Sequence, residues 1–160
     1  MLSDSALLGL PAPAKLNLFL HVVGRRPDGK HLLESVFTLI DLHDTIDLFR
    51  LEEPVVERTG DVIGNVEKDL CVRAARLLME TFDVRSGVRI HVEKRIPAGA
   101  GMGGGSSDAA TVLIGLNRLF GLGLSRSALM ELGERLGADV PFFIFGRTGF
   151  VEGIGEIITP

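Results

Sequence analysis

The chain has 160 residues, of which 46% are hydrophobic and 24% are charged. This is the balance of one soluble globular domain with a packed core, and the length does not allow two full domains. The formal charge of -4 and the isoelectric point near 5.6 disfavour nucleic acid as a partner, because nucleic-acid-binding domains usually present a basic face. With one cysteine, Cys71, and no apolar run long enough for a membrane span, we expect a cytoplasmic protein that binds no membrane.

Alternation of residue types over positions 15–23 predicts a strand with one buried face. Lys15 and Asn17 fall on the opposite face, so their side chains are expected to point the same way. The residues predicted to be buried are Leu16, Leu18, Leu20 and Val22.

A predicted hairpin follows from the next segments. Residues 25–29 combine a proline with a glycine, and the apolar run at 32–40 predicts a returning strand with His31 near the bend. Further short strands are predicted at 44–51 and 55–58, which makes the sheet mostly antiparallel up to this point.

Helical periodicity dominates the rest of the chain. Apolar residues at three- and four-residue spacing predict helices at about 68–81, from a glycine-rich segment to about Phe120, and from Ser125 to about Leu136. A strand at 88–92 separates the first two helices, and another strand follows at 148–152. Strands before helices, with one helix between strands, predict an α+β fold rather than a regular doubly wound one.

A glycine-rich loop at 97–107 joins a predicted strand to a predicted helix. Five glycines in the positions 99–105 leave backbone N–H groups unshielded by side chains, so an anion can approach them closely. With the start of the helix and two serine hydroxyls, these groups predict a cradle for the phosphates of a nucleoside triphosphate. The residues of this loop are Pro97, Ala98, Gly99, Ala100, Gly101, Met102, Gly103, Gly104, Gly105, Ser106 and Ser107.

Two better-known phosphate loops do not fit this segment. It lacks the terminal Gly-Lys-Ser/Thr of the Walker loop, and the neighbouring elements do not repeat as the β-α-β units that the dinucleotide fingerprint requires. A flexible linker is the alternative interpretation. Pro97 at the start and a well-patterned helix directly after Ser107 favour the phosphate cradle.

The run Pro-x-Gly-x-Gly-x-Gly-Gly-Gly-Ser-Ser-Asp-Ala-Ala at 97–110 resembles the central motif of the GHMP small-molecule kinases. Segments at 13–18, 26–31, 137–141 and 152–156 resemble, in the same order, the branch of that family that phosphorylates a cytidyl diphosphate polyol in the synthesis of isoprenoid precursors. Four separated segments in the same order identify this branch of the family more specifically than one loop does.

The resemblance implies that residues 1–160 form the N-terminal, ATP-binding domain of such a kinase, with the C-terminal domain absent from this chain. It implies a twisted, mostly antiparallel sheet with helices packed on one face and a left-handed crossover. The cofactor is then ATP, with Mg²⁺ carried by the nucleotide, and the reaction transfers the terminal phosphate to a small alcohol. The sequence shows no carboxylate cluster that defines a metal site held by the protein itself.

Three alternatives stay open beside this interpretation. The chain could act on a different small alcohol of the same family, or it could be a nucleotide-binding fragment without turnover, which the missing second domain favours. An RNA-binding domain of similar fold is the third, and the acidic balance counts against it.

The resemblance assigns catalytic roles to two residues. Asp139 is expected to accept the proton of the substrate hydroxyl. Lys15 is expected to lie beside it, to keep the carboxylate ionised and to neutralise charge that develops on the transferred phosphate. The alternatives are an aspartate in local turn hydrogen bonds at a helix end and a solvated strand lysine.

Binding roles follow from the same resemblance. Asn17 is expected to orient the polyol, and Lys30 and His31 to bind the cytidyl group, although Lys30 stands where the family usually has a tyrosine. Lys94 ends the strand before the loop and is expected near adenine or phosphate. Asp69 occupies a position where an asparagine commonly helps to hold adenine. Outside the resemblance, Asn17 is an edge-strand amide and His31 a lone histidine after a turn.

Overall fold

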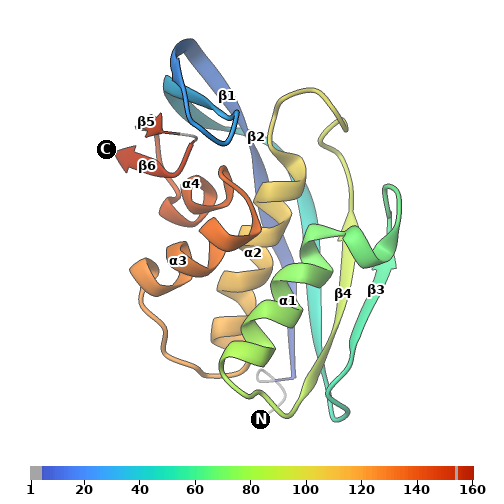
Figure 1. Cartoon of the computed structure of the whole chain (residues 1–160). Helices are drawn as coiled ribbons and strands as arrows, with labels where there is room; N and C mark the ends of the chain where they lie inside the picture. Colours follow the sequence, from blue (N-terminus) through green and yellow to red (C-terminus); the bar gives the residue numbers. More distant parts are fainter. Residues whose placement is uncertain (1–4, 154) are drawn as a thin grey trace.

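One long strand, β2, organises the sheet in this computed structural model, which describes residues 5–153 and 155–160. The sheet is drawn in Figure 1 with its strands labelled. The strands are β1 (Ala6–Arg25), β2 (His31–Leu51), β3 (Val56–Gly60), β4 (Gly87–Glu93), β5 (Gly149–Gly153) and β6 (Ile157–Thr159).

The two edges of β2 are used differently. β1 pairs antiparallel with β2 almost from end to end and takes one edge. The other edge is divided, because β4 pairs with residues 45–51 and β5 pairs with residues 33–37. Within the described chain, residues 38–44 have no strand partner on that edge. The glycine-rich loop begins beside this gap.

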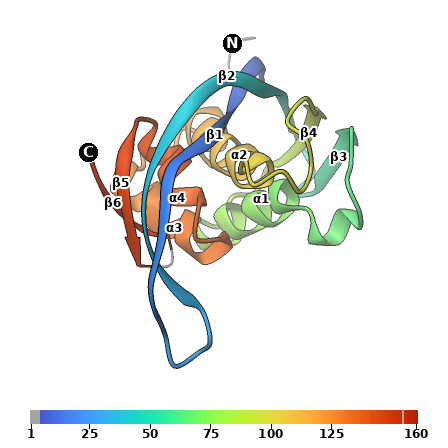
Figure 2. The same cartoon turned by 90° about the horizontal axis from the view of Figure 1, so that it is seen from above.

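The α-helices cover one face of the sheet, as the view from above shows (Figure 2). Only β3 and β4 pair in parallel, with α1 between them in the chain, so the predicted α+β fold with a mostly antiparallel sheet is confirmed. The hand of that connection stays a prediction. The helices are a short 3₁₀ turn, η2 (Val66–Lys68), and α1 (Leu70–Thr81), α2 (Gly104–Leu119), α3 (Arg126–Leu136) and α4 (Val140–Phe145).

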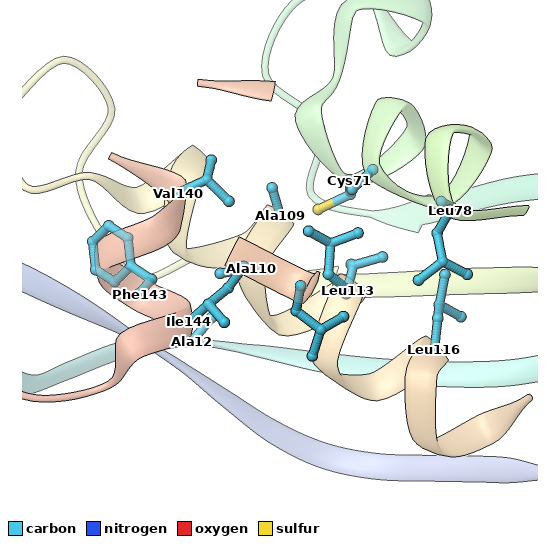
Figure 3. Packing of buried hydrophobic residues seen from close by; sticks show 14 of the residues in the cluster. Ala12, Cys71, Leu78, Ala109, Ala110, Leu113, Leu116, Val140, Phe143 and Ile144 are labelled. Atoms are coloured by element: carbon cyan, nitrogen blue, oxygen red, sulfur yellow. The ribbon is translucent and has the colours of Figure 1, made fainter. Parts of the chain in front are cut away.

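The core lies between this helical layer and the strands β2 and β4. Figure 3 shows α2 in its middle, with Leu78 of α1 on one side and Ile144 of α4 on the other. Ile46 and Leu48 of β2 close the core from the sheet side and are fully buried. Each such side chain stabilises the fold by about 1.5–3 kcal/mol through burial. The apolar stripes predicted for the helices therefore form the observed core.

The prediction that this face of the first strand is buried is wrong. Leu16, Leu18, Leu20 and Val22 are 43%, 62%, 49% and 58% exposed. The β1–β2 hairpin extends beyond the helices, so no layer covers its end (Figure 2). A register irregularity between Asn17 and Phe19 also breaks the simple alternation along the strand.

Two further features concern element bounds. The strands predicted at 32–40 and 44–51 are one continuous strand, β2, although polar residues interrupt the apolar pattern between them. The apolar run after Pro141 is a helix, α4, with the proline in its first turn, where a missing N–H costs nothing. In the described part of the chain, no helix is both long and apolar enough to cross a membrane.

Candidate active site

The glycine-rich loop starts where β4 separates from β2. The last pair of the ladder joins Thr45 to Glu93, and the next backbone N–H groups along the chain belong to residues that have left the sheet. Asp44 Oδ1 accepts two of them, from Arg95 N at 2.6 Å and from Ile96 N at 2.9 Å. A buried carboxylate therefore replaces the missing strand and sets the direction in which the loop departs.

Positive backbone angles shape the loop itself. Gly99, Gly101 and Gly103 have φ values of 72°, 71° and 72°, which lie in a region that residues other than glycine rarely adopt. A Cβ atom on Gly99 or Gly101 would meet nothing within 4 Å, so this part of the loop borders open space. A bulky group can approach the backbone there without displacing protein atoms.

The helix that follows has a free N-terminus. Gly103 is its N-cap residue and makes no side-chain capping bond, and the first helical bond runs from Ser107 N to Gly103 O. The N–H groups of the first turn are thus available to an external acceptor. The predicted loop-to-helix junction is confirmed, and α2 begins at Gly104, within the segment predicted as the loop.

A pocket lies along the loop and contains most of the predicted nucleotide-binding residues. Lys94, Asp69 and the loop from Pro97 to Gly105 line it. Ser106 and Ser107 lie in the first turn of α2 outside the lining, and the Ser107 hydroxyl is buried with no hydrogen-bond partner in the described chain. The other lining residues are Arg58, Ile63, Lys68, Leu70, Cys71, Ile96 and Asp108.

Two charged residues of the pocket are already engaged by the protein. Asp69 caps α1 by accepting hydrogen bonds from the N–H groups of Cys71 and Val72, and its other oxygen lies 3.4 Å from Arg58 Nε. Lys94 is paired with Asp44 and Asp108 at 2.7 and 2.8 Å. The backbone amides of the loop therefore remain as the main donors for an anion.

Lys68 is a pocket residue that the sequence analysis missed. It is exposed and lines the same pocket as the loop. The signal in the sequence is its position just before α1. The start of α1 and the glycine-rich start of α2 line the same pocket, so a lysine at the start of α1 lies beside the loop.

Lys15 lies on the opposite side of the loop from this pocket. Its backbone N–H donates to Met102 O at 2.9 Å, and a Cβ on Gly103 would come within 3.3 Å of Lys15 Cγ. The side chain is 5% exposed and its Nζ lies 2.7 Å from Asn17 Oδ1 and 4.0 Å from the centre of the Phe37 ring. It is therefore a buried cation held against the loop, not a solvated strand lysine.

Asp139 sits at the N-terminal end of α4 with a carboxylate that makes no capping bond. Gly155 lies against it, because a Cβ on that glycine would be 3.0 Å from Asp139 Oδ1. Burial raises the pKa of Asp139, and the positive charge of Lys15 opposes this rise. Burial likewise lowers the pKa of Lys15, opposed by Asp139. The two predicted catalytic groups thus lie close enough to influence each other's ionisation.

Lys30 and His31 lie apart from these groups, at the exposed tip of the hairpin. Asp28 accepts a hydrogen bond from Lys30 N and closes the turn. The alternation along β2 places His31 on the same face as buried Phe37, which is also the face of Asn17. The distance from Asn17 to the tip is up to roughly 26 Å along an extended strand at about 3.3 Å per residue.

We predict that Gly103→Ala lowers the free energy of unfolding by about 1–3 kcal/mol. The alanine would have to keep the left-handed backbone conformation of Gly103, and its methyl group would lie 2.7 Å from Phe143 Cζ. Gly121→Ala is the matched control, because Gly121 has a φ of 63° and open space around its Cβ position. Urea denaturation that gave equal losses for both variants would contradict the close contact with Phe143.

Comparison with known proteins agrees with this geometry. Residues 69–147 match the family described as the GHMP kinases N terminal domain. The chain belongs to the GHMP kinases and carries their N-terminal domain fold.

Two relatives and one solved structure are named as kinases of the same substrate. The chain is 60% identical over 151 residues to 4-diphosphocytidyl-2-C-methyl-D-erythritol kinase of Ralstonia pickettii, covering 94% of this chain and 52% of that protein. The enzyme of the same name from Polynucleobacter necessarius is 61% identical over 150 residues, covering 93% and 51%. A crystal structure of 4-(cytidine 5'-diphospho)-2C-methyl-D-erythritol kinase superposes with a TM-score of 0.79 at 42% identity, over 94% of this chain and 53% of that one.

A more distant structure supports the fold alone. The mevalonate kinase of Methanococcus jannaschii has a TM-score of 0.69 at 14% identity, over 96% of this chain and 54% of that one. The chain spans about half the length of the curated relatives it matches.

Proposed function

We propose that this chain is the ATP-binding half of a kinase that phosphorylates the 2-hydroxyl of 4-diphosphocytidyl-2-C-methyl-D-erythritol, in the methylerythritol phosphate route to isoprenoid precursors. One observation carries the proposal: the glycine-rich loop lines an open pocket, and the Lys15–Asp139 pair lies against the same loop outside that pocket, with Lys15 in contact with Gly103. A donor phosphate and an acceptor hydroxyl held in those two places would meet at Gly103. Relatives that the chain matches at 60% and 42% identity are named for that substrate.

The residues divide the chemistry between them. The acceptor oxygen forms a bond to the terminal phosphorus, the bond from that phosphorus to the oxygen of the departing ADP breaks, and the hydroxyl proton passes to the Asp139 carboxylate. Lys15 supplies positive charge beside the site where charge builds up. Its bond to Asn17 Oδ1 fixes the amide beside it, so that the Asn17 NH₂ group can donate to the polyol.

The hydrogen-bond donors of the loop fit the phosphates of a nucleoside triphosphate. Its glycines expose backbone N–H groups to open space, and the helix N-terminus adds its positive end. ATP supplies the phosphoryl group, and Mg²⁺ bound to its phosphates neutralises part of their charge. Within the described residues, no group of three His, Cys, Asp or Glu side chains could hold a metal, so the proposal assigns the ion to the nucleotide.

The hairpin is proposed to bind the cytidyl end of the substrate through His31 and Lys30. Its exposed tip and the shared face of His31 and Asn17 are consistent with an elongated substrate that spans both. The cytoplasmic location expected from the single buried cysteine belongs to the same proposal.

A nucleotide-binding fragment without turnover is the second candidate, and the half-length match favours it. Phosphorus NMR of ATP with the cytidyl substrate separates the two. The measurement compares this chain alone with a fusion protein, defined as this chain joined after Pro160 to the remaining part of the Ralstonia pickettii relative. We expect product from the fusion protein, and its absence there, with ATP bound, would reject the kinase proposal.

We predict that Lys15→Met lowers turnover of the fusion protein by about 10²-fold. It should also move the acid limb of the kcat/KM profile to higher pH. Asp139 must be ionised to accept a proton, burial already raises its pKa, and Lys15 is the charge that opposes the rise. Exposed Arg135→Met is the matched control. An unchanged acid limb in Lys15→Met would show that Lys15 does not influence the ionisation of Asp139, which would contradict this role.

A further inference from the structure

A buried cluster of three ionisable side chains lies at the base of the glycine-rich loop. Asp44 comes from β2, Lys94 follows β4, and Asp108 belongs to α2. Lys94 Nζ donates to Asp44 Oδ2 at 2.7 Å and to Asp108 Oδ2 at 2.8 Å. The side chains of the two aspartates are 0% and 5% exposed and that of Lys94 is 15% exposed, so the two carboxyls are buried beneath the pocket.

The cluster connects the two ends of the loop. Lys94 lies three residues before the loop, and Asp108 directly follows it in the first turns of α2. Asp44 adds bonds to Arg95 N and Ile96 N, the last residues before Pro97. Three elements that are distant in the chain therefore fix the separation of the strand end and the helix start. The conformation of the glycines between them depends on that separation.

The charges of the cluster do not balance if every group is ionised. One ammonium faces two carboxylates, which leaves one negative charge beneath a loop proposed to hold phosphates. Asp108 Oδ1 is buried and has no hydrogen-bond partner in the described chain. Burial raises the pKa of Asp108 to about 8, and the neighbouring Asp44 adds to the rise, whereas the pKa of Asp44 is lowered. Of the two carboxyls, Asp108 is therefore the one that retains a proton to higher pH.

We propose that Asp44, Lys94 and Asp108 form a positioning cluster for the glycine-rich loop, in which a proton retained on Asp108 keeps the cluster neutral behind the bound phosphates. The proposal rests on the proposed ATP-binding function and deepens it. The cluster does not touch the reacting atoms. It acts by holding the loop ends and by removing a charge that would repel the nucleotide.

The groups that face Asp108 do not titrate in place of it. Asp44 is ionised throughout, and the pKa of Lys94 is raised by its two carboxylate partners. On α1, burial raises the pKa of the Cys71 thiol well above its ordinary value. The other charged groups that act on this thiol are Asp69, the N-cap residue of α1, and Arg58 of β3. Lys15, across the loop, has a lowered pKa and can lose its charge as pH rises. A comparison with Asp108→Asn removes that contribution, because Lys15 is the same in both proteins.

The test is calorimetric titration of the 160-residue chain with ATP and Mg²⁺ from about pH 7 to about pH 9.5. Ionisation of Asp108 would place a negative charge behind the phosphates, so we expect ATP affinity of the unmodified chain to fall about tenfold relative to Asp108→Asn over this range. Asparagine imitates the protonated carboxyl and cannot ionise, so it keeps the cluster neutral over the whole range. Exposed Glu131→Gln is the control for a change of surface charge.

A second readout is proton uptake, compared between the parent and Asp108→Asn because Lys15 is the same in both. Above the pKa of Asp108, nucleotide binding by the parent should be accompanied by the larger proton uptake, which appears as a dependence of the binding enthalpy on the ionisation enthalpy of the buffer. A merely structural role of Asp108 would leave the uptake of the two proteins equal. Binding of ATP with parallel pH profiles for the parent and Asp108→Asn, or with equal proton uptake, would overturn the inference alone. Failure to bind ATP at every pH would overturn the proposed function and the inference with it.

Discussion

Replacing Asp139 with asparagine is expected to lower turnover of the fusion protein by about 10²- to 10⁴-fold, the usual contribution of a positioned general base. The amide has the shape of the carboxylate but accepts no proton at working pH. ATP affinity should stay close to that of the parent, since Asp139 lies outside the lining of the pocket along the glycine-rich loop, where ATP is proposed to bind. Single-turnover phosphorus NMR and calorimetric titration measure the two quantities separately.

The same substitution should stabilise the fold at neutral pH. The pKa of Asp139 is raised by burial, so between the ordinary carboxyl pKa and the raised one the folded protein retains a proton that the unfolded chain has lost. Stability of the parent therefore falls as pH rises through this window, and asparagine removes that loss. Tm should be higher for Asp139→Asn at neutral pH, and the difference should disappear in acid.

Glu134→Gln on α3 is the matched control for these two effects, because it removes an exposed carboxylate close in the chain. It should change neither turnover nor Tm. Asp139→Asn with undiminished turnover would remove the residue from the role of base. A large loss of Tm would instead show that the carboxylate is needed for structure.

The glycine-rich loop and the helices around it could be predicted because their signals are local. Glycines at 99, 101 and 103 adopt the positive φ values that only this residue tolerates easily. Ser125 caps α3 by accepting a hydrogen bond from Ala128 N, as its position before a periodic apolar stripe indicated. Such features depend on a few neighbouring residues, all of which can be seen in one short window of sequence.

The face of β1 could not be predicted in the same way. Alternation tells which residues share a face, but whether that face is covered depends on elements far along the chain. Leu20 and Val22 are exposed because the helical layer ends before the hairpin does. Lys15, on the face expected to be exposed, is buried against Phe37 and the loop.

Asp44 shows the same limit at the site. In the sequence it is the first residue of the strand predicted at 44–51, whereas in the fold it is a buried residue within the longer strand β2. Its partners, Lys94, Arg95 and Ile96, lie about fifty positions further on. Only the pairing of β2 with β4 brings them together, so a polar residue at such a position is explained by tertiary structure alone.

Asp44→Ala is the substitution expected to destabilise the fold most, by about 3–5 kcal/mol at neutral pH. It removes the ionised partner of Lys94 and leaves the buried N–H groups of Arg95 and Ile96 without their acceptor. The pKa of Asp44 is lowered in the fold, so its contribution is present above the ordinary carboxyl pKa and is lost as pH falls through the lowered one. The stability difference should therefore shrink in acid. Urea denaturation at several pH values measures this.

Two matched variants show which part of Asp44 matters. Asp44→Asn keeps an acceptor for the two N–H groups and loses only the charge, so it should cost less than Asp44→Ala, and exposed Asp41→Ala on the same strand should cost little. In Asp44→Asn the pKa of Asp108 should fall, because Asp108 becomes the sole carboxylate partner of Lys94. Proton uptake on ATP binding would then diminish. Equal losses for Asp44→Ala and Asp41→Ala would mean that the cluster does not hold the loop.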